Sequence, residues 1–157
     1  MAPDLLDALI ALHSVQDGDT LTVACTPRQP IRLRIRLADI DAPERDEGLF
    51  HESREQLAEL VRGSPLRVEP AAIQRGGWDG YNRLIAYVWV REMLVQEMLV
   101  VLGRAVVYCP RGPNQHTQRL EKAQEIARKN ELGVWLYPSH RLTDVYHRRK
   151  HKPFNRR

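Results

Sequence analysis

The sequence has little cysteine and no long apolar segment. Its 157 residues include two cysteines, Cys25 and Cys109, with no CxxC or Cys/His spacing, which disfavours a zinc site. We interpret them as two ordinary thiols, with a disulfide between them as the alternative. No apolar run approaches the roughly 20 residues that a membrane-spanning helix needs, so we expect no association with a membrane.

The N-terminal segment lacks positive charge, because MAPDLLDALIAL contains no basic residue. A secretory signal begins with positive charge, so this stretch is not typical of one. The compartment stays open: secreted or periplasmic if a signal precedes these residues, cytoplasmic otherwise.

Basic charge is concentrated at the end of the chain. Residues 141–157 carry seven Lys or Arg and one Asp, a net charge of +6, whereas residues 1–140 carry seventeen basic and nineteen acidic residues, a net charge of −2. The body is therefore not a general basic binder of nucleic acid. The tail can contact phosphates, and the alternative is a solvated, disordered tail.

Apolar periodicity predicts the order of the secondary structure. Alternation over residues 31–37 (IRLRIRL) is typical of a strand, and residues 8–39 as a whole predict strands interrupted at 26–30. A helix is predicted over 49–62, then strands from 66 and over 84–90. Two further helices are predicted over 93–103 and from Asn114 or Thr117 to Gly133, and no internal repeat is visible.

Three strands, a helix, two strands and two helices predict an α+β protein with a mainly β core. Five short antiparallel strands close most economically into a small barrel, and the OB-fold places a helix between strands three and four. We therefore expect a five-stranded OB-fold β-barrel with three α-helices. Residues 1–140 form the single domain in this interpretation, and residues 141–157 form the tail.

Acidic residues gather where predicted strands end. Asp39 and Asp41 are two residues apart, so they point the same way in an extended segment. Pro43 favours an extended conformation at Ala42, which can hold a carbonyl oxygen beside a carboxylate. Two aspartates, a carbonyl and water are ligands that suit a hard cation such as calcium.

Three further polar residues suit phosphate chemistry. Arg36 lies on the strand face opposite Ile35, and two guanidinium groups such as Arg36 and Arg83 can bind a phosphate in a bidentate manner. A carboxylate such as Glu44 can orient or deprotonate a water. Taken singly, each of these residues is more often a turn former, a cap or a solvated strand residue.

The spacing of these motifs resembles the staphylococcal nuclease (thermonuclease) family. The resemblance runs from about Val15 to Trp135. It rests on DGDT at 17–20, Arg36 followed by DAPE at 41–44, DGYNR at 79–83, LVQEMLVVLGRAVVY at 94–108 and LEKAQEIARKNELGVW at 120–135.

This resemblance implies a role for each matching residue. The metal ligands would be the carboxylates of Asp19 and Asp41 and the backbone carbonyl of Ala42, with Asp17 shaping the turn. The catalytic residues would be Arg36, Glu44 and Arg83, and the substrate-binding residues would be Tyr81 and Tyr108.

Two positions depart from the family pattern. Asn82 replaces a glycine, and asparagine tolerates the left-handed backbone that the glycine adopts. Asp39 is an additional carboxylate, which either biases the metal site or is merely exposed.

The resemblance implies a calcium-dependent phosphodiesterase. It would hydrolyse single-stranded or unwound DNA and RNA with little sequence specificity, leaving 3′-phosphate and 5′-hydroxyl ends, and we expect it to act as a monomer. The alternative is a non-catalytic OB-fold module that binds nucleic acid or a partner, because some family members have lost the acidic residues and kept the barrel.

Overall fold

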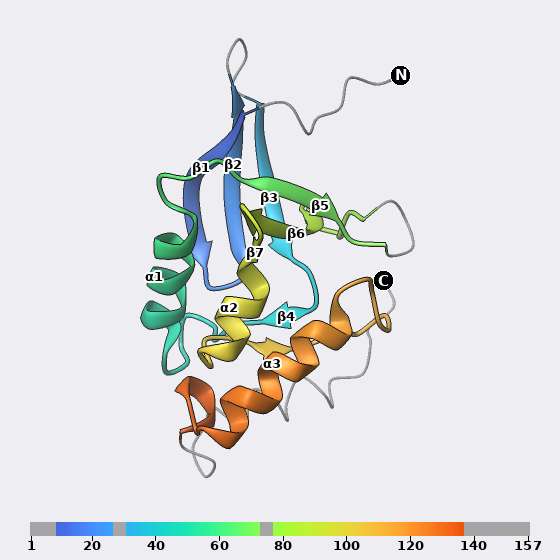
Figure 1. Cartoon of the computed structure of the whole chain (residues 1–157). Coiled ribbons are helices and arrows are strands. Elements are labelled where there is room, and N and C mark those ends of the chain that lie inside the picture. The colour runs from blue at the N-terminus through green and yellow to red at the C-terminus, as the bar shows by residue number, and fades with distance from the viewer. Residues whose placement is uncertain (1–8, 27–30, 73–76, 137–157) are drawn as a thin grey trace.

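The computed structural model describes residues 9–26, 31–72 and 77–136, so the basic tail lies outside the described residues. The elements are drawn in Figure 1. The strands are β1 (Leu9–Asp17), β2 (Thr20–Thr26), β3 (Ile31–Leu37), β4 (Ile40–Asp41), β5 (Arg67–Pro70), β6 (Leu84–Val90), β7 (Met93–Leu94) and β8 (Val106–Val107). The helices are α1 (Phe50–Val61), α2 (Val95–Val101) and α3 (Thr117–Lys129), followed by the 3₁₀ turn η1 (Gly133–Trp135).

One sheet with the order β1-β2-β3-β6-β5 forms the main layer, with β7 paired to β6 and a separate β4–β8 ladder. Only the β3–β6 pair is parallel. The outer strands β1 and β5 meet through one isolated bridge, in which the Leu66 N–H donates to the Ile10 carbonyl at 2.8 Å. The α+β prediction with three helices and a mainly β core is confirmed for the described residues, and their arrangement is consistent with the predicted OB-fold. The predicted closed barrel is not formed among them, because Ile10 and Leu66 make only an isolated bridge.

Alternation along the strands determines which side chains enter the core. Ile35 and Leu37 of β3 and Leu21 and Val23 of β2 are buried, and they pack on one face of the sheet. The helices cover the lower part of that core, with α1 beside β1 and α3 packed against α2 (Figure 1). No helix in the described segments is both long enough and apolar enough to cross a membrane.

The helix boundaries differ from the predictions mainly at the C-terminal side. Helix α1 agrees with the prediction to within one residue at each end, whereas Met93 and Leu94 form β7 ahead of α2. Helix α3 ends at Lys129, so Gly133 was wrongly predicted to be its end. Gly133 packs instead against Gly103, and the N–H of Val134 donates to the Gly103 carbonyl at 2.9 Å.

The contact between Gly103 and Gly133 requires both glycines. Each has a positive φ, 68° and 54° respectively. A Cβ atom on Gly103 would collide with the Leu132 carbonyl, and one on Gly133 would collide with the Gly103 carbonyl. The end of α2 and the η1 turn can therefore approach this closely only because neither residue has a side chain.

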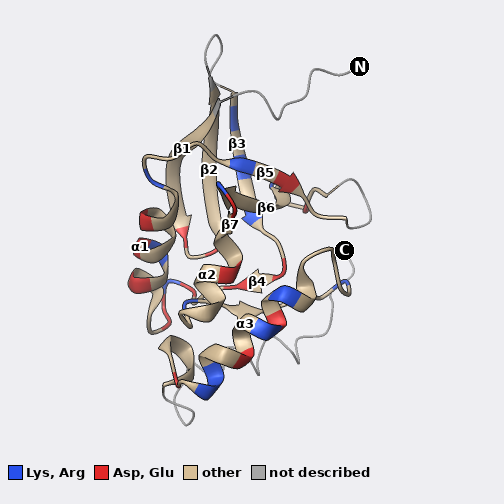
Figure 2. Cartoon of the chain, in the orientation of Figure 1, with Lys and Arg blue, Asp and Glu red and all other residues tan. Residues whose placement is uncertain are grey.

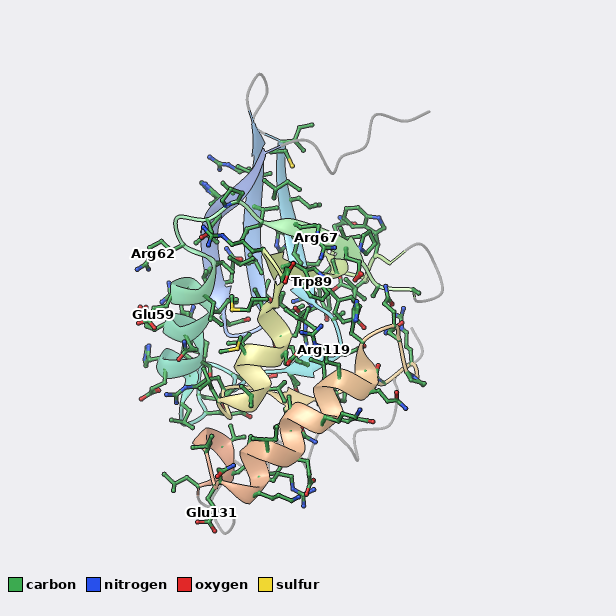
Figure 3. All side chains as sticks on the ribbon, in the orientation of Figure 1. Glu59, Arg62, Arg67, Trp89, Arg119 and Glu131 are labelled. Carbon is green, nitrogen blue, oxygen red and sulfur yellow. The ribbon has the colours of Figure 1, made fainter. Side chains whose placement is uncertain are left out.

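A tryptophan between two arginines holds α3 against the sheet. Trp89 of β6 lies 4.7 Å from the Arg67 guanidinium and 5.4 Å from that of Arg119, ring centre to carbon. Figure 3 shows these three side chains in a row across β5, β6 and α3. Arg119 also forms an ion pair with Glu97 of α2, so this cluster joins both C-terminal helices to the sheet.

Candidate active site

A cleft of about 490 Å³ opens where β1, β3 and the segment after β4 meet. It contains every predicted site residue except Tyr81. The predicted residues that line it are Asp19, Arg36, Asp41, Ala42, Glu44, Arg83 and Tyr108. These residues come from segments far apart in the sequence, so the cleft depends on the tertiary fold.

The turn between β1 and β2 presents Asp19 to the cleft. Asp17 closes the turn, because its Oδ1 accepts the N–H of Asp19 at 3.0 Å. Burial, followed by the negative charge of Asp19, raises the pKa of Asp17 to about 6. Asp19 itself is 7% exposed, and its Oδ2 accepts the N–H of Ala42 at 2.8 Å. Both Asp17 and Asp19 line the cleft, and the hydrogen bond that Asp17 accepts is the one expected of a residue that shapes the turn.

Gly18 is required by close packing beneath the turn. A Cβ atom at this position would lie 2.8 Å from the Cβ atoms of both Ala42 and Ser53. Such a separation is shorter than a carbon contact permits, so a larger residue must displace the chain around Ala42 or α1.

Arg36 contacts both of the predicted metal-binding carboxylates. Its Nη2 lies 3.4 Å from Asp19 Oδ2 and 3.6 Å from Asp41 Oδ1. Its Nη1 donates to the Leu37 carbonyl at 2.7 Å, which fixes the plane of the guanidinium. Asp41 is 5% exposed, so a single cation already faces two buried carboxylates at the base of the cleft.

The chemistry of the donor set fits a hard divalent cation. Asp19 and Asp41 supply carboxylate oxygens within reach of one positive group, and Ala42, beside Asp41, is buried next to them. Across the described segments, no group of three or more His, Cys, Asp or Glu side chains is arranged to hold a metal. A calcium ion here would therefore need water or substrate oxygens to complete its six to eight ligands.

Arg83 is held at the opposite side of the cleft by Asp79. Its Nε lies 2.7 Å from Asp79 Oδ2, and its Nη1 donates to Thr20 Oγ1 at 3.2 Å. Burial tends to raise the pKa of Asp79, but hydrogen bonds from the backbone N–H groups of Arg83 and Tyr81 and from the Arg83 side chain outweigh it and lower the pKa. Asn82 has a φ of 57°, which confirms the left-handed backbone predicted for it.

The remaining predicted residues differ in position. Glu44 is exposed at the rim of the cleft, and its backbone N–H donates to Glu47 Oε2 at 2.7 Å. Tyr81 is 73% exposed and does not line the cleft, but its ring lies 5.4 Å from the Arg83 guanidinium. Tyr108 is half-buried and lines both this cleft and a neighbouring cavity of about 310 Å³ that also shares Arg36 and Arg83.

Asp39 is buried, which corrects the alternative that it is merely exposed. It is 7% exposed with a φ of 62°. Its Oδ2 accepts hydrogen bonds from the Tyr87 hydroxyl and, at 2.8 Å, from Thr117 Oγ1, while its Oδ1 accepts the Asn114 amide at 2.8 Å. Its backbone carbonyl accepts the N–H of Tyr108. Asp39 therefore joins β4, β6 and the N-terminus of α3 behind the cleft.

The buried carboxylate of Asp39 contributes to raised pKa values in two neighbouring groups. Burial, followed by the hydrogen bond to Asp39, raises the pKa of the Tyr87 hydroxyl, which stays a donor. Burial, followed by the charge of Asp39, raises the pKa of the Cys109 thiol to about 12. Cys109 and Cys25 are both free, so the alternative of a disulfide is not realised.

The sequence matches the family described as Staphylococcal nuclease homologue over residues 34–137. An uncharacterized endonuclease of Haemophilus influenzae is 31% identical over 121 residues, which cover 77% of this chain and 62% of that protein. The micrococcal nuclease of Shigella flexneri is 31% identical over 139 residues, covering 80% of this chain and 72% of the relative. Protein ParB of Escherichia coli is 32% identical over 131 residues, covering 78% and 69%. The chain thus spans less than two thirds of the length of the Haemophilus protein.

Proposed function

Because this chain belongs to the staphylococcal nuclease family, we propose that it is a calcium-dependent nuclease that hydrolyses phosphodiester bonds of DNA and RNA. One observation carries the proposal: the two predicted arginines, Arg36 and Arg83, line a single cleft together with two buried aspartates and Glu44. An anionic phosphodiester entering this cleft would meet guanidinium donors and a carboxylate at its rim, which are the groups needed to bind phosphate and activate water.

The two arginines bind and stabilise the phosphate in this proposal. Arg36 and Arg83 present planar guanidinium groups that match phosphate oxygens. When water attacks phosphorus in line, negative charge grows on those oxygens, so donors already aimed at them stabilise the transition state more than the substrate. Asp79 holds the Arg83 guanidinium in place at 2.7 Å, which limits the reorganisation that this binding requires.

Glu44 activates the attacking water. A carboxylate at the rim of the cleft can accept a proton from water as the water oxygen bonds to phosphorus. The bond from phosphorus to the 5′-oxygen breaks, and that oxygen takes a proton from solvent water, so the products carry a 3′-phosphate and a 5′-hydroxyl. Backbone phosphates carry no sequence information, so recognition through the arginines gives little sequence specificity.

Calcium would be held by Asp19, Asp41 and the carbonyl of Ala42. When bound, it would add positive charge that stabilises the charge developing on the phosphoryl oxygens. Two carboxylates and a carbonyl leave several ligand positions to water or substrate, which suits the irregular coordination of calcium better than the strict octahedron of magnesium.

The proposal is tested by incubating the purified chain with denatured DNA or RNA in calcium, in magnesium or in chelator. We expect acid-soluble fragments in calcium, much less in magnesium and none in chelator. Fragments with 5′-hydroxyl ends accept phosphate from polynucleotide kinase without prior phosphatase treatment, which checks the polarity of cleavage. Equal hydrolysis in chelator and calcium would contradict the metal requirement, whereas binding without hydrolysis would favour a non-catalytic OB-fold module.

A further inference from the structure

Strand β3 carries a column of arginines that leads away from the cleft. The pairing of β2 with β3 is regular from Thr20–Arg36 to Cys25–Ile31, so side chains alternate between the two faces without a bulge. Arg32, Arg34 and Arg36 therefore share one face, opposite the buried Ile35. Arg36 lines the cleft, whereas Arg32 and Arg34 are exposed beyond it.

The outer two arginines of this column, Arg32 and Arg34, have no opposite charge beside them on β2. The residues of β2 paired with Arg36, Arg34 and Arg32 are Thr20, Thr22 and Ala24. Figure 2 shows only blue bands along β3 and no charge colour along β2. Within β1–β3 the single carboxylate is Asp17, at the cleft end of the column, and no ion pair recorded among the described residues includes Arg32 or Arg34.

The like charges of Arg32 and Arg34 repel each other, and no ion pair among the described residues offsets this repulsion. Arginines two residues apart on a strand are separated by roughly 6.6–6.8 Å, close to the distance between consecutive phosphates along a nucleic-acid strand. The threonine and alanine side chains that flank the column carry no charge that would repel a phosphate. The upper parts of β1–β3 also rise above the rest of the body in Figure 1.

We propose that Arg32 and Arg34 bind phosphates next to the one cleaved, so that β3 is a track extending the active cleft along the substrate. This inference rests on the proposed nuclease function for the identity of the polyanion. The track implies that a substrate long enough to cover β3 binds more tightly than a substrate that occupies only the cleft. Because the track contacts unreacting phosphates equally in substrate and transition state, it lowers KM and leaves kcat unchanged.

The test is direct binding of a long fluorescein-labelled oligothymidylate, in chelator, over a series of salt concentrations. The double variant Arg32→Gln/Arg34→Gln should bind about tenfold more weakly at about 0.1 M salt, and its salt slope should fall by about 1.4, which is about 0.7 for each lost phosphate contact on a single strand. In calcium, the same variant should show a raised KM and an unchanged kcat. Arg32→Lys/Arg34→Lys should retain most of the affinity, because the charge remains.

The matched control is Arg62→Gln/Arg128→Gln, which removes the same charge elsewhere. Figure 3 shows Arg62 at the end of α1, pointing away from the sheet, and Arg128 is an exposed residue of α3 paired with Glu125. The proposed track would be overturned if Arg32→Gln/Arg34→Gln bound the oligonucleotide with wild-type affinity, or if the control variant lost as much affinity. Competition by polyglutamate as strong as that by the oligonucleotide would also overturn it. If the wild-type protein binds the oligonucleotide with a steeper salt dependence than the track variant but does not cleave in calcium, the nuclease proposal is overturned and the phosphate track is not.

Discussion

The carboxylate of Asp19 accepts a hydrogen bond from the backbone N–H of Ala42 at 2.8 Å. This bond joins the turn between β1 and β2 to the residue that follows β4, and this turn together with the end of β4 and Ala42 supplies all three proposed calcium ligands. Because Gly18 lies directly against Ala42, the distance between the turn and Ala42 depends on a residue with no side chain.

Replacing Gly18 by alanine should therefore damage the site. The new Cβ would sit 2.8 Å from those of Ala42 and Ser53, and overpacking of this kind costs about 1–3 kcal/mol. We expect a lower melting temperature and a weaker apparent calcium affinity, measured by titrating activity with calcium. Gly80→Ala is the matched control, because a Cβ there has open space. Equal calcium affinity in both variants would show that the spacing does not matter.

Arg36→Lys, Arg83→Lys and Glu44→Gln should each lose activity while keeping stability. Removing one group aimed at developing charge typically costs about 10²–10³ in turnover, and lysine cannot replace a planar two-pronged donor. Each variant should melt near wild type. The controls are Arg128→Lys and Glu125→Gln, an exposed pair on α3, which should keep full kcat/KM. Near-full activity in all three site variants would refute the assignment of these residues.

Asp39→Ala should destabilise the protein strongly. The change leaves the Tyr87 and Thr117 hydroxyls and the Asn114 amide without their acceptor, and each buried unsatisfied group costs about 1–3 kcal/mol. We expect the free energy of unfolding in urea to fall by about 3 kcal/mol. Asp39→Asn keeps one acceptor and tolerates the positive φ, so it should lose less. The exposed Asp46→Ala serves as control, and an equal effect there would contradict the role of the network.

The Cys109 thiol should react slowly in the folded protein. Burial and the nearby Asp39 charge raise its pKa to about 12, and the thiolate is the reactive form. In a Cys25→Ser background, the rate of alkylation should still rise about tenfold per pH unit between about pH 8 and pH 10, without levelling off. In urea the rate should level off near the ordinary thiol pKa of about 8.5. A plateau below about pH 10 in the folded protein would contradict the raised pKa.

Local sequence patterns predicted the elements that depend on local chemistry. The period of two over β3 and the apolar face of α1 give the observed strand and helix almost residue for residue, because burial of one face is encoded in neighbouring residues. Asn82 was correctly expected to be left-handed for a different reason: it replaces a glycine of the family pattern, and asparagine tolerates that backbone. The grouping of Asp19, Arg36 and Arg83 came from the family resemblance, since spacing alone cannot fix which strands become neighbours.

The network around Asp39 could not be predicted because its partners lie far along the chain. Asn114 and Thr117 are separated from Asp39 by 75 and 78 residues, and nothing near Asp39 indicates that they would meet it. The same limit applies to the barrel closure, where a single pair, Ile10 and Leu66, joins the outer strands. A polar residue at a strand end can be exposed, line a site or be buried in a hydrogen-bond network, and the tertiary fold determines which of these occurs.

The contact between Gly103 and Gly133 determines when, during synthesis on the ribosome, the packing of the chain can be completed. A ribosome synthesises every proposed site residue, Tyr108 being the last, before it reaches Gly133. Until Gly133 and Val134 emerge, the Gly103 carbonyl has no N–H from Val134 to accept, and the space that buries Val134 stays open. We therefore expect a growing chain to hold all of its candidate catalytic groups while its packing is still unfinished.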